Sequence, residues 1–143
     1  MGSADARVLT INGGSSSIKF ALFEHGDSPK RIVEGGIDRI GFPNAVFHVR
    51  AAIPNDSFSR PVAAPDRTVA VGVLMDWIER RSDRGALVAV GHRVLQGGPK
   101  YYKPQRITAD LIAALHRLSL FDPEHIPEIL IQDWCCICRL LKT

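Results

Sequence analysis

The stretch TINGGSSSIKFALFE, residues 10–24, decides how the chain begins to fold. Two apolar, strand-like segments, residues 7–12 and 18–24, flank a run of five small residues at 13–17. Small residues let the backbone approach a ligand closely, and their N–H and hydroxyl groups suit a phosphate. A two-residue Asn-Gly turn would connect the strands at a lower entropic cost. The pattern therefore favours a phosphate-binding turn over a purely structural hairpin.

Two common phosphate motifs are absent from this stretch. A Walker loop needs Gly-x-x-x-x-Gly-Lys-Ser/Thr at the start of a helix, and a dinucleotide fingerprint needs Gly-x-Gly-x-x-Gly. In the strand–turn–strand arrangement that remains, backbone N–H groups can face a phosphate and a lysine can add positive charge. Asn12 offers an uncharged oxygen that can contact the water shell of a metal ion. The candidate phosphate-binding residues are Gly13, Gly14, Ser15, Ser16, Ser17 and Lys19.

Length and composition fit a single globular domain. The chain has 143 residues, of which 45% are hydrophobic and 23% are charged. Its formal net charge of +3 is too small to argue for a nucleic-acid partner. No apolar run approaches the roughly 20 residues of a membrane span, and the N-terminus lacks the apolar core of a signal peptide. These features predict a cytoplasmic protein that binds neither nucleic acid nor a membrane.

The hydrophobic pattern predicts an α/β domain with a mixed sheet. After the first hairpin, alternating and apolar runs predict strands at residues 31–40, 45–53 and 87–95. The polar segment at 55–65 is expected to be a surface loop. Four consecutive strands followed by a helix, a strand and further helices are typical of this class.

The same pattern predicts three helices. Residues 66–81 have a period of 3.6, and a second helix at 108–118 has Thr108 as its N-cap. Residues 121–127 form a proline-bracketed loop, and 128–141 are expected to be a third helix. The apolar stripe expected on the first helix is Val69, Val73, Leu74, Trp77 and Ile78.

Three cysteines, Cys135, Cys136 and Cys138, lie close together near the C-terminus. An odd number in four positions is no disulfide framework. Cys135 and Cys138 have the spacing of half a zinc or redox site, but the sequence has no second pair, and the nearest histidine is His125. Buried thiols that act as small hydrophobes are therefore the favoured interpretation.

Three motifs together resemble the acetate kinase family. The first, at residues 10–24, is similar to the phosphate-binding turn with which family members begin. The second, AVGHRVLQGG at 89–98, resembles the family's His-Arg-Val-Val-His-Gly-Gly strand, with Gln96 in place of the second histidine. The third, FDPEHIP at 121–127, resembles a Leu-Ala-Pro-Leu-His-Asn-Pro loop. They occur in the family's order and span about residues 7–131.

The resemblance implies an actin-like ATPase fold, which is a ribonuclease H-like domain with a mixed β-sheet and flanking helices, here incomplete. It also implies phosphoryl transfer from ATP to acetate, giving ADP and acetyl phosphate, with Mg²⁺. Ser16 and Ile18 resemble the acetate/propionate branch rather than the butyrate kinases, and acetate and propionate both stay open as substrates. By position, Asn12 looks like a magnesium-site residue, and Ser15, Ser17 and Lys19 look like residues that bind the phosphates of ATP.

Arg93 resembles the family's catalytic and substrate-binding arginine. A guanidinium suits a carboxylate or acyl phosphate because it binds two oxygens at once and keeps its charge. The alternative is an ion pair at the end of a strand. The role of Gln96 is open, and His92 and His125 are expected to be hydrogen-bonded structural histidines.

The last segment, QDWCCICRLLKT at 132–143, does not resemble the family's continuation. We expect residues 1–131 to be a partial N-terminal acetate kinase-like domain and 132–143 a divergent apolar tail, of the kind a frameshift or gene truncation produces. An aspartate, a histidine, a second arginine and a glutamate of the family have no counterpart here.

Three functions stay open on this sequence. The chain can be the N-terminal part of an acetate kinase-type enzyme, a non-catalytic remnant that binds phosphate or nucleotide weakly, or a structural domain completed by another chain. The chain alone is expected to be inactive, since much of the family's charge stabilisation lies in the missing residues. Its exposed apolar surface is expected to favour self-association.

Overall fold

The computed structural model describes residues 6–81, 86–93 and 103–119. These residues fall into two compact units. The first unit holds the described residues as far as Arg93, which form six strands, one α-helix and a short 3₁₀ turn. The second holds residues 103–119 with a single α-helix.

Several predictions fall outside the described residues. These are the loop at 121–127 with His125, the helix at 128–141, the cysteine cluster, and the domain boundary after residue 131. Gln96 also lies outside them, as do the last two residues of the predicted strand at 87–95.

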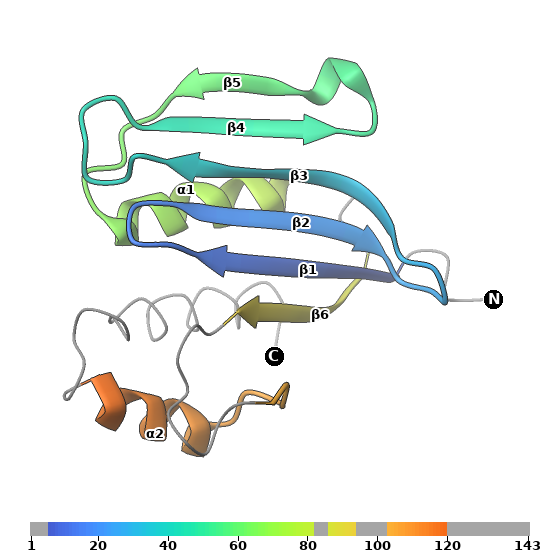
Figure 1. Ribbon diagram of the computed structural model, residues 1–143. Helices are drawn as coiled ribbons and strands as arrows, with labels where there is room; N and C mark the ends of the chain where they lie inside the picture. The colour runs from blue at the N-terminus through green and yellow to red at the C-terminus, as the bar shows by residue number, and fades with distance from the viewer. Residues whose placement is uncertain (1–5, 82–85, 94–102, 120–143) are drawn as a thin grey trace. The chain divides into compact units, whose positions relative to one another are not determined.

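The first unit is built on a six-stranded mixed sheet with the order β5-β4-β3-β2-β1-β6. Strands β1 to β5 form an antiparallel meander, whereas β6 pairs in parallel with β1 (Figure 1). The predicted mixed α/β architecture is thereby confirmed. The strands are β1 (Ala6–Gly13), β2 (Ile18–Glu24), β3 (Lys30–Asp38), β4 (Val46–Ala51), β5 (Phe58–Pro61) and β6 (Ala86–Arg93).

The segment predicted as a surface loop at 55–65 contains regular structure, so that prediction is wrong. It begins within a 3₁₀ turn, η1 (Pro54–Asp56), and then contains β5. Strand β5 has four residues, of which only Phe58 is partly buried, so it has no hydrophobic alternation that the sequence could reveal. Its backbone pairing with β4, from Val46↔Pro61 to Val49↔Phe58, makes it a strand.

The core of the first unit lies between one face of the sheet and helix α1 (Arg67–Arg80), which crosses behind the sheet in Figure 1. Alternate side chains of β1 to β4 point to this face, as expected for strands with one buried side. The buried strand residues are Leu9, Ile11, Ile18, Phe20, Leu22, Val33, Ile37, Phe47 and Val49.

Helix α1 begins after Asp66, whose side chain accepts a hydrogen bond from the N–H of Val69 at 2.9 Å. This is the N-cap interaction that satisfies an otherwise unpaired helix N–H group. Leu74 and Ile78 are buried as predicted, but Val69 is 39% exposed. The buried face is therefore rotated by about one residue from the predicted stripe. It consists of Ala70, Val71, Leu74, Met75 and Ile78.

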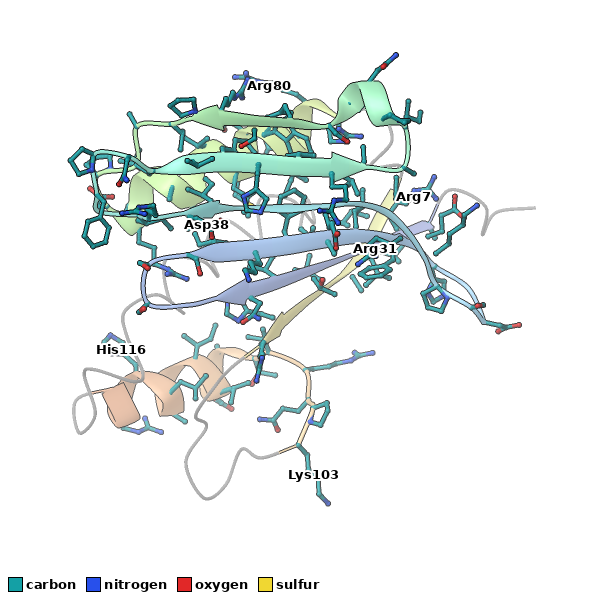
Figure 2. The ribbon with its side chains drawn as sticks, turned by 45° about the horizontal axis from the view of Figure 1, so that its top comes forward. Arg7, Arg31, Asp38, Arg80, Lys103 and His116 are labelled. Atoms are coloured by element: carbon teal, nitrogen blue, oxygen red, sulfur yellow. The ribbon has the colours of Figure 1, made fainter. Side chains whose placement is uncertain are left out.

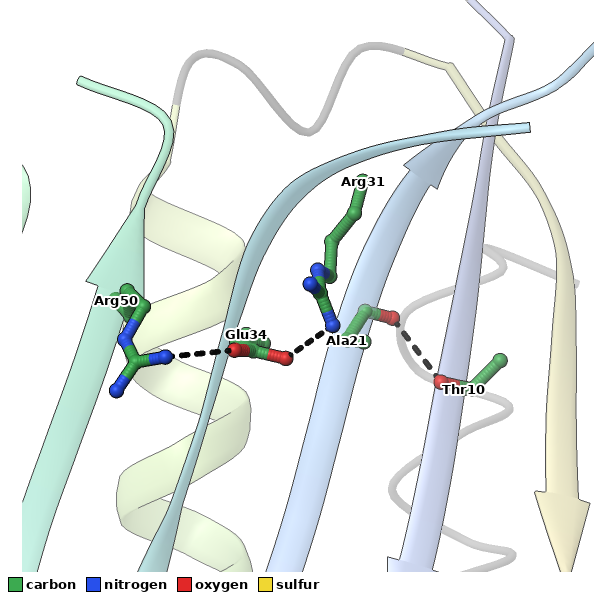
Figure 3. Close-up of polar contacts among 5 residues, drawn as sticks. All are labelled: Thr10, Ala21, Arg31, Glu34 and Arg50. Carbon is green, nitrogen blue, oxygen red and sulfur yellow. Dashed lines mark hydrogen bonds and ion pairs between the residues drawn. The ribbon is translucent and has the colours of Figure 1, made fainter. Parts of the chain in front are cut away.

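The opposite face of the sheet carries charged and polar side chains among apolar ones. Figure 3 shows Glu34 on β3 between two arginines, with Arg31 Nη1 at 2.6 Å and Arg50 Nη1 at 3.7 Å from its carboxylate oxygens. On β1, the hydroxyl of Thr10 donates to the carbonyl of Ala21 at 3.4 Å. Ion pairs at such partly exposed positions contribute little to stability.

The second unit contains helix α2 (Ala109–Ser119). Thr108 Oγ1 accepts a hydrogen bond from the N–H of Leu111 at 3.2 Å, which confirms the predicted N-cap. Leu111 and Leu115, one turn apart, are buried. Among the described residues, neither α1 nor α2 has the length and hydropathy required to cross a membrane.

Candidate phosphate-binding site

The small-residue run forms the turn between β1 and β2 as predicted, except that its first residue, Gly13, belongs to β1. The strands pair from Arg7↔Glu24 to Gly13↔Ile18, so four residues, Gly14–Ser17, connect them. The N–H of Gly14 donates to the carbonyl of Ser17 at 2.8 Å and closes the turn. A Cβ atom on Gly14 would lie 2.9 Å from Ser17 Oγ, so a side chain there would require the Ser17 hydroxyl to turn away. We refer to Gly14–Ser17 below as the phosphate turn, after its proposed role.

Two carbonyl groups of the phosphate turn accept hydrogen bonds from elsewhere in the first unit. The carbonyl of Ser16 accepts from the N–H of Ile40 at 2.9 Å, and that of Gly14 accepts from Arg67 Nη1 at 2.7 Å. Within the described residues, no hydrogen bond uses the N–H groups of Ser15, Ser16 or Ser17. Among the described residues, these three consecutive N–H groups are therefore not used within the protein.

Strand register brings three of the predicted site residues into one row. Asn12 on β1 lies opposite Lys19 on β2 and opposite Arg93 on β6. Residues directly opposite one another point to the same face, and neighbouring strands lie about 4.8 Å apart, so the row spans about 10 Å. Because the adjacent Ile11 and Ile18 point into the core, the row lies on the face opposite the core.

His92 lies on the other face from Arg93. It pairs in register with Ile11, a core residue, and its Nδ1 atom is buried. This placement keeps His92 out of the row. Arg93, by contrast, is exposed.

Strand β6 is an edge strand of the sheet within the described residues, and its Val88 is 53% exposed.

The row continues past Lys19 with a residue that has no side chain. Gly36 on β3 pairs with Lys19, and a Cβ atom there would lie 2.3 Å from the carbonyl oxygen of Ile18. The next residue in the row is His48 on β4, whose Nδ1 lies 3.3 Å from Asp38 Oδ2. In Figure 2, Asp38 marks this end of the sheet. Gly36 is buried, and the backbone of β2 approaches it too closely for any side chain to fit there.

Arg67 is a site neighbour that the sequence did not reveal. It is the first residue of α1, and its bond to Gly14 joins positions 53 residues apart. Two atoms of its guanidinium, Nε and Nη2, are buried. A cation at a helix N-terminus opposes the helix dipole. The first position of a helix is therefore not where sequence reasoning places a functional arginine, and no residue pattern indicated this contact.

The described residues do not form a magnesium site by themselves. They contain no cluster of three or more His, Cys, Asp or Glu side chains that could hold a metal ion. Asn12 lies between two cations, Lys19 and Arg93, in the row. Magnesium is usually held by one or two carboxylates together with substrate phosphates. Asn12, whose uncharged oxygen can contact the water shell of a metal ion, stays the predicted magnesium-site residue.

A separate cleft of about 280 Å³ lies at the opposite end of the sheet. Arg7 and Arg31, which line it, are labelled in Figure 2 at the end away from Asp38. Glu24 and Asp56 also line this cleft, so its charges are mixed. It contains none of the predicted site residues, and we exclude it from the candidate site.

Comparison with known protein families shows which family the chain belongs to. The model of the acetokinase family matches residues 7–132. The chain belongs to the acetokinase family. The acetate kinase of Geobacillus kaustophilus is 35% identical to it over 129 residues, which cover 88% of this chain and 32% of that protein. The acetate kinase of Rhodopseudomonas palustris is 36% identical over 126 residues, covering 84% and 31%.

Solved structures of the family share the fold. The acetate kinase of Porphyromonas gingivalis matches with a TM-score of 0.74 and 28% identity, over 95% of this chain and 35% of that one. A propionate kinase of Francisella tularensis matches with a TM-score of 0.75 and 24% identity, over 96% and 34%. The predicted fold class, an incomplete actin-like ATPase domain, is confirmed. The chain spans about a third of the length of these relatives.

Proposed function

We propose that this chain carries the phosphate-binding part of an acetate kinase-type phosphotransferase, which converts ATP and acetate to ADP and acetyl phosphate. The observation that supports this most directly is the row of Lys19, Asn12 and Arg93 beside the phosphate turn. The row provides two cations and a neutral amide on one face of the sheet. Beside it lie three N–H groups, those of Ser15–Ser17, that make no hydrogen bond to the residues the structure describes.

Each group has a role that follows from its chemistry. The N–H groups of the turn and the ammonium of Lys19 bind phosphate oxygens of ATP, which is supplied as its magnesium complex. Arg93 holds the carboxylate of acetate with its two-pronged guanidinium. Asn12, between them, donates its amide hydrogens to the phosphoryl group in transit.

In the proposed reaction, an acetate oxygen forms a bond to the terminal phosphorus of ATP. The bond from that phosphorus to the bridging oxygen breaks, and ADP leaves with the electron pair. The transferred group carries negative charge on three oxygens, so cations on both sides lower the barrier. A row of about 10 Å accommodates a carboxylate at Arg93 and a phosphate at Lys19. Acetate and propionate remain the two candidate substrates.

The test is a titration of the isotope-labelled chain with magnesium ATP and with tripolyphosphate, followed by NMR. We expect the largest shifts at the backbone amides of Ser15–Ser17 and of Lys19. Lys19→Met should weaken binding about tenfold, the effect typical for loss of a charged hydrogen bond. Lys30→Met is the matched control, because Lys30 is an exposed lysine at the far end of the neighbouring strand. Absent shifts at the turn, or equal losses in both variants, would refute the proposal.

A second candidate function is phosphate binding without catalysis of phosphoryl transfer. The observation that favours it is the coverage, since the chain spans 32% of the Geobacillus kaustophilus acetate kinase. The two candidates share the phosphate turn and differ in turnover. Binding of ATP at the turn without formation of acetyl phosphate would favour the second one.

A further inference from the structure

The phosphate turn has a feature that its own sequence does not explain. Two carbonyl groups of the turn are held by hydrogen bonds from other parts of the first unit: Arg67 donates to Gly14, and the N–H of Ile40 donates to Ser16. The first tie is made by a charged side chain, and hydrogen bonds to charged groups are about twice as strong as neutral ones.

The geometry of a peptide unit connects these ties to ligand binding. In a trans peptide, the carbonyl of one residue and the N–H of the next lie in one plane and point in opposite directions. The described residues contain no cis peptide bond. Fixing the Gly14 carbonyl toward Arg67 therefore directs the N–H of Ser15 away from Arg67. Fixing the Ser16 carbonyl toward Ile40 directs the N–H of Ser17 away from Ile40 in the same manner.

We infer that Arg67 is a positioning residue for phosphate binding. By holding the carbonyl of Gly14, it sets the peptide unit whose N–H, on Ser15, is offered to a phosphate oxygen, and it keeps a carbonyl oxygen from turning toward that anion. The inference rests on the proposed phosphate-binding role of the turn. Its ligand class is the same, the polyphosphate of a nucleotide.

Burial makes the interaction effective. The Nε and Nη2 atoms of Arg67 are buried, and the contact to Gly14 is 2.7 Å long. Water competes poorly for a hydrogen bond in such a place, so the tie persists between ligand-binding events. An arginine keeps its charge at any physiological pH, which makes the tie independent of pH.

The test uses the 143-residue chain and three variants. Arg67→Gln removes the charged tie, and Arg67→Lys keeps the charge but replaces the planar fork by a single ammonium. Arg80→Gln is the matched control, because Arg80 is an exposed arginine at the other end of the same helix. Two quantities are measured for each: the affinity for tripolyphosphate, and the hydrogen-exchange rate of the Gly14 amide without ligand.

For Arg67→Gln we expect an affinity about tenfold weaker and Gly14 exchange about tenfold faster, the equivalent of one charged hydrogen bond. Arg67→Lys should change both quantities in the same direction but less, and it serves as the test if the glutamine variant does not fold. Arg80→Gln should stay within about twofold of the parent. A substitution of Arg67 that leaves either quantity unchanged, while the parent binds tripolyphosphate, overturns the inference.

The two proposals fail in different ways. If the parent chain does not bind tripolyphosphate or ATP, the proposed function of the turn fails, whatever the variants show. The exchange rate of Gly14 then decides the inference by itself. Faster exchange in Arg67→Gln alone would still establish Arg67 as the residue that positions the turn, and unchanged exchange would overturn that role.

Discussion

Arg93 lies directly opposite Asn12 across the parallel pairing of β6 with β1. This relationship places a guanidinium from position 93 two strands away from Lys19, at the end of the sheet where the chain forms its small-residue turn. A carboxylate bound at Arg93 and a phosphate bound at Lys19 would therefore meet over Asn12.

Arg93→Ala should impair the acyl end of the site selectively. We expect the affinity of the chain for acetyl phosphate to fall about tenfold or more, because the variant lacks the guanidinium that makes a charged hydrogen bond to that ligand. Affinity for tripolyphosphate should change less than about twofold. Calorimetric titration with both ligands makes the comparison. Arg50→Ala, which removes an exposed arginine from the same face of the sheet, is the control, and equal losses for the two ligands would contradict the assignment.

Gly36→Ala should damage both stability and the site. The new Cβ atom would lie 2.3 Å from the carbonyl oxygen of Ile18, so β3 must move away from β2 beside Lys19. We expect a loss of about 1–3 kcal/mol in the free energy of unfolding, measured by urea denaturation. Gly72→Ala is the control, and it should change the free energy of unfolding in the opposite direction. Nothing lies within 4 Å of a Cβ at this helical position, and alanine there should stabilise by about 0.5–1 kcal/mol.

Phe47→Ala should be among the most destabilising core substitutions. Phe47 is completely buried and packs its ring against Phe58 at 5.2 Å and Trp77 at 5.7 Å between ring centroids. Removing a buried phenylalanine costs about 3–5 kcal/mol. Phe42→Ala, at a position 55% exposed, should cost less than about 0.5 kcal/mol. A similar urea midpoint for the two variants would show that the aromatic cluster does not hold the sheet to α1.

Asp66→Ala should weaken the start of α1. The variant loses the hydrogen bond from the N–H of Val69 to Asp66 Oδ1, which an N-cap side chain provides. The expected cost is about 0.5–2 kcal/mol in the free energy of unfolding. Asp27→Ala, in an exposed turn, should leave stability within about 0.5 kcal/mol of the parent. Because Arg67 follows Asp66 directly, faster exchange of the Gly14 amide is also expected in Asp66→Ala.

The 143-residue chain assayed by itself should not turn over acetate and ATP at the rate of an ordinary enzyme. The chain spans 32% of the Geobacillus kaustophilus acetate kinase, and half of a site cannot preorganise both reactants. The assay couples ADP formation to a detectable signal with acetate, ATP and magnesium present. Turnover of about 1 per second or more would show that the chain, alone or self-associated, builds a complete site.

Local sequence patterns predicted the parts of the fold that depend on local chemistry. The run of small residues predicted the first turn. A threonine just before an apolar helical pattern predicted the N-cap at Thr108, whose hydroxyl accepts a hydrogen bond from the N–H of Leu111. Val69 was assigned to the wrong face of α1 because valines also occupy positions 71 and 73, which makes the helix apolar on more than one side. Packing against the sheet, which no local pattern contains, selects the buried face.

The candidate site was predictable only as separate pieces. Asn12 and Lys19 share a hairpin, so their closeness follows from the turn itself. That Arg93 joins them depends on strand order, and the resemblance to a family supplied this link where periodicity could not. Arg67 and Gly14 are 53 residues apart, and their contact involves a single backbone carbonyl group, so no pattern of residue types predicts it.

The strand order also implies a sequence of events during folding. Each pairing from β1 to β5 joins strands that are consecutive in the chain, whereas β6 pairs with β1 through partners such as Ala6 and Ala86. Contacts between distant residues form late, because closing a long loop costs more entropy than closing a hairpin. On this view the meander folds first and β6 docks afterwards. The chain would acquire its phosphate turn early and the arginine opposite Asn12 only in the last step.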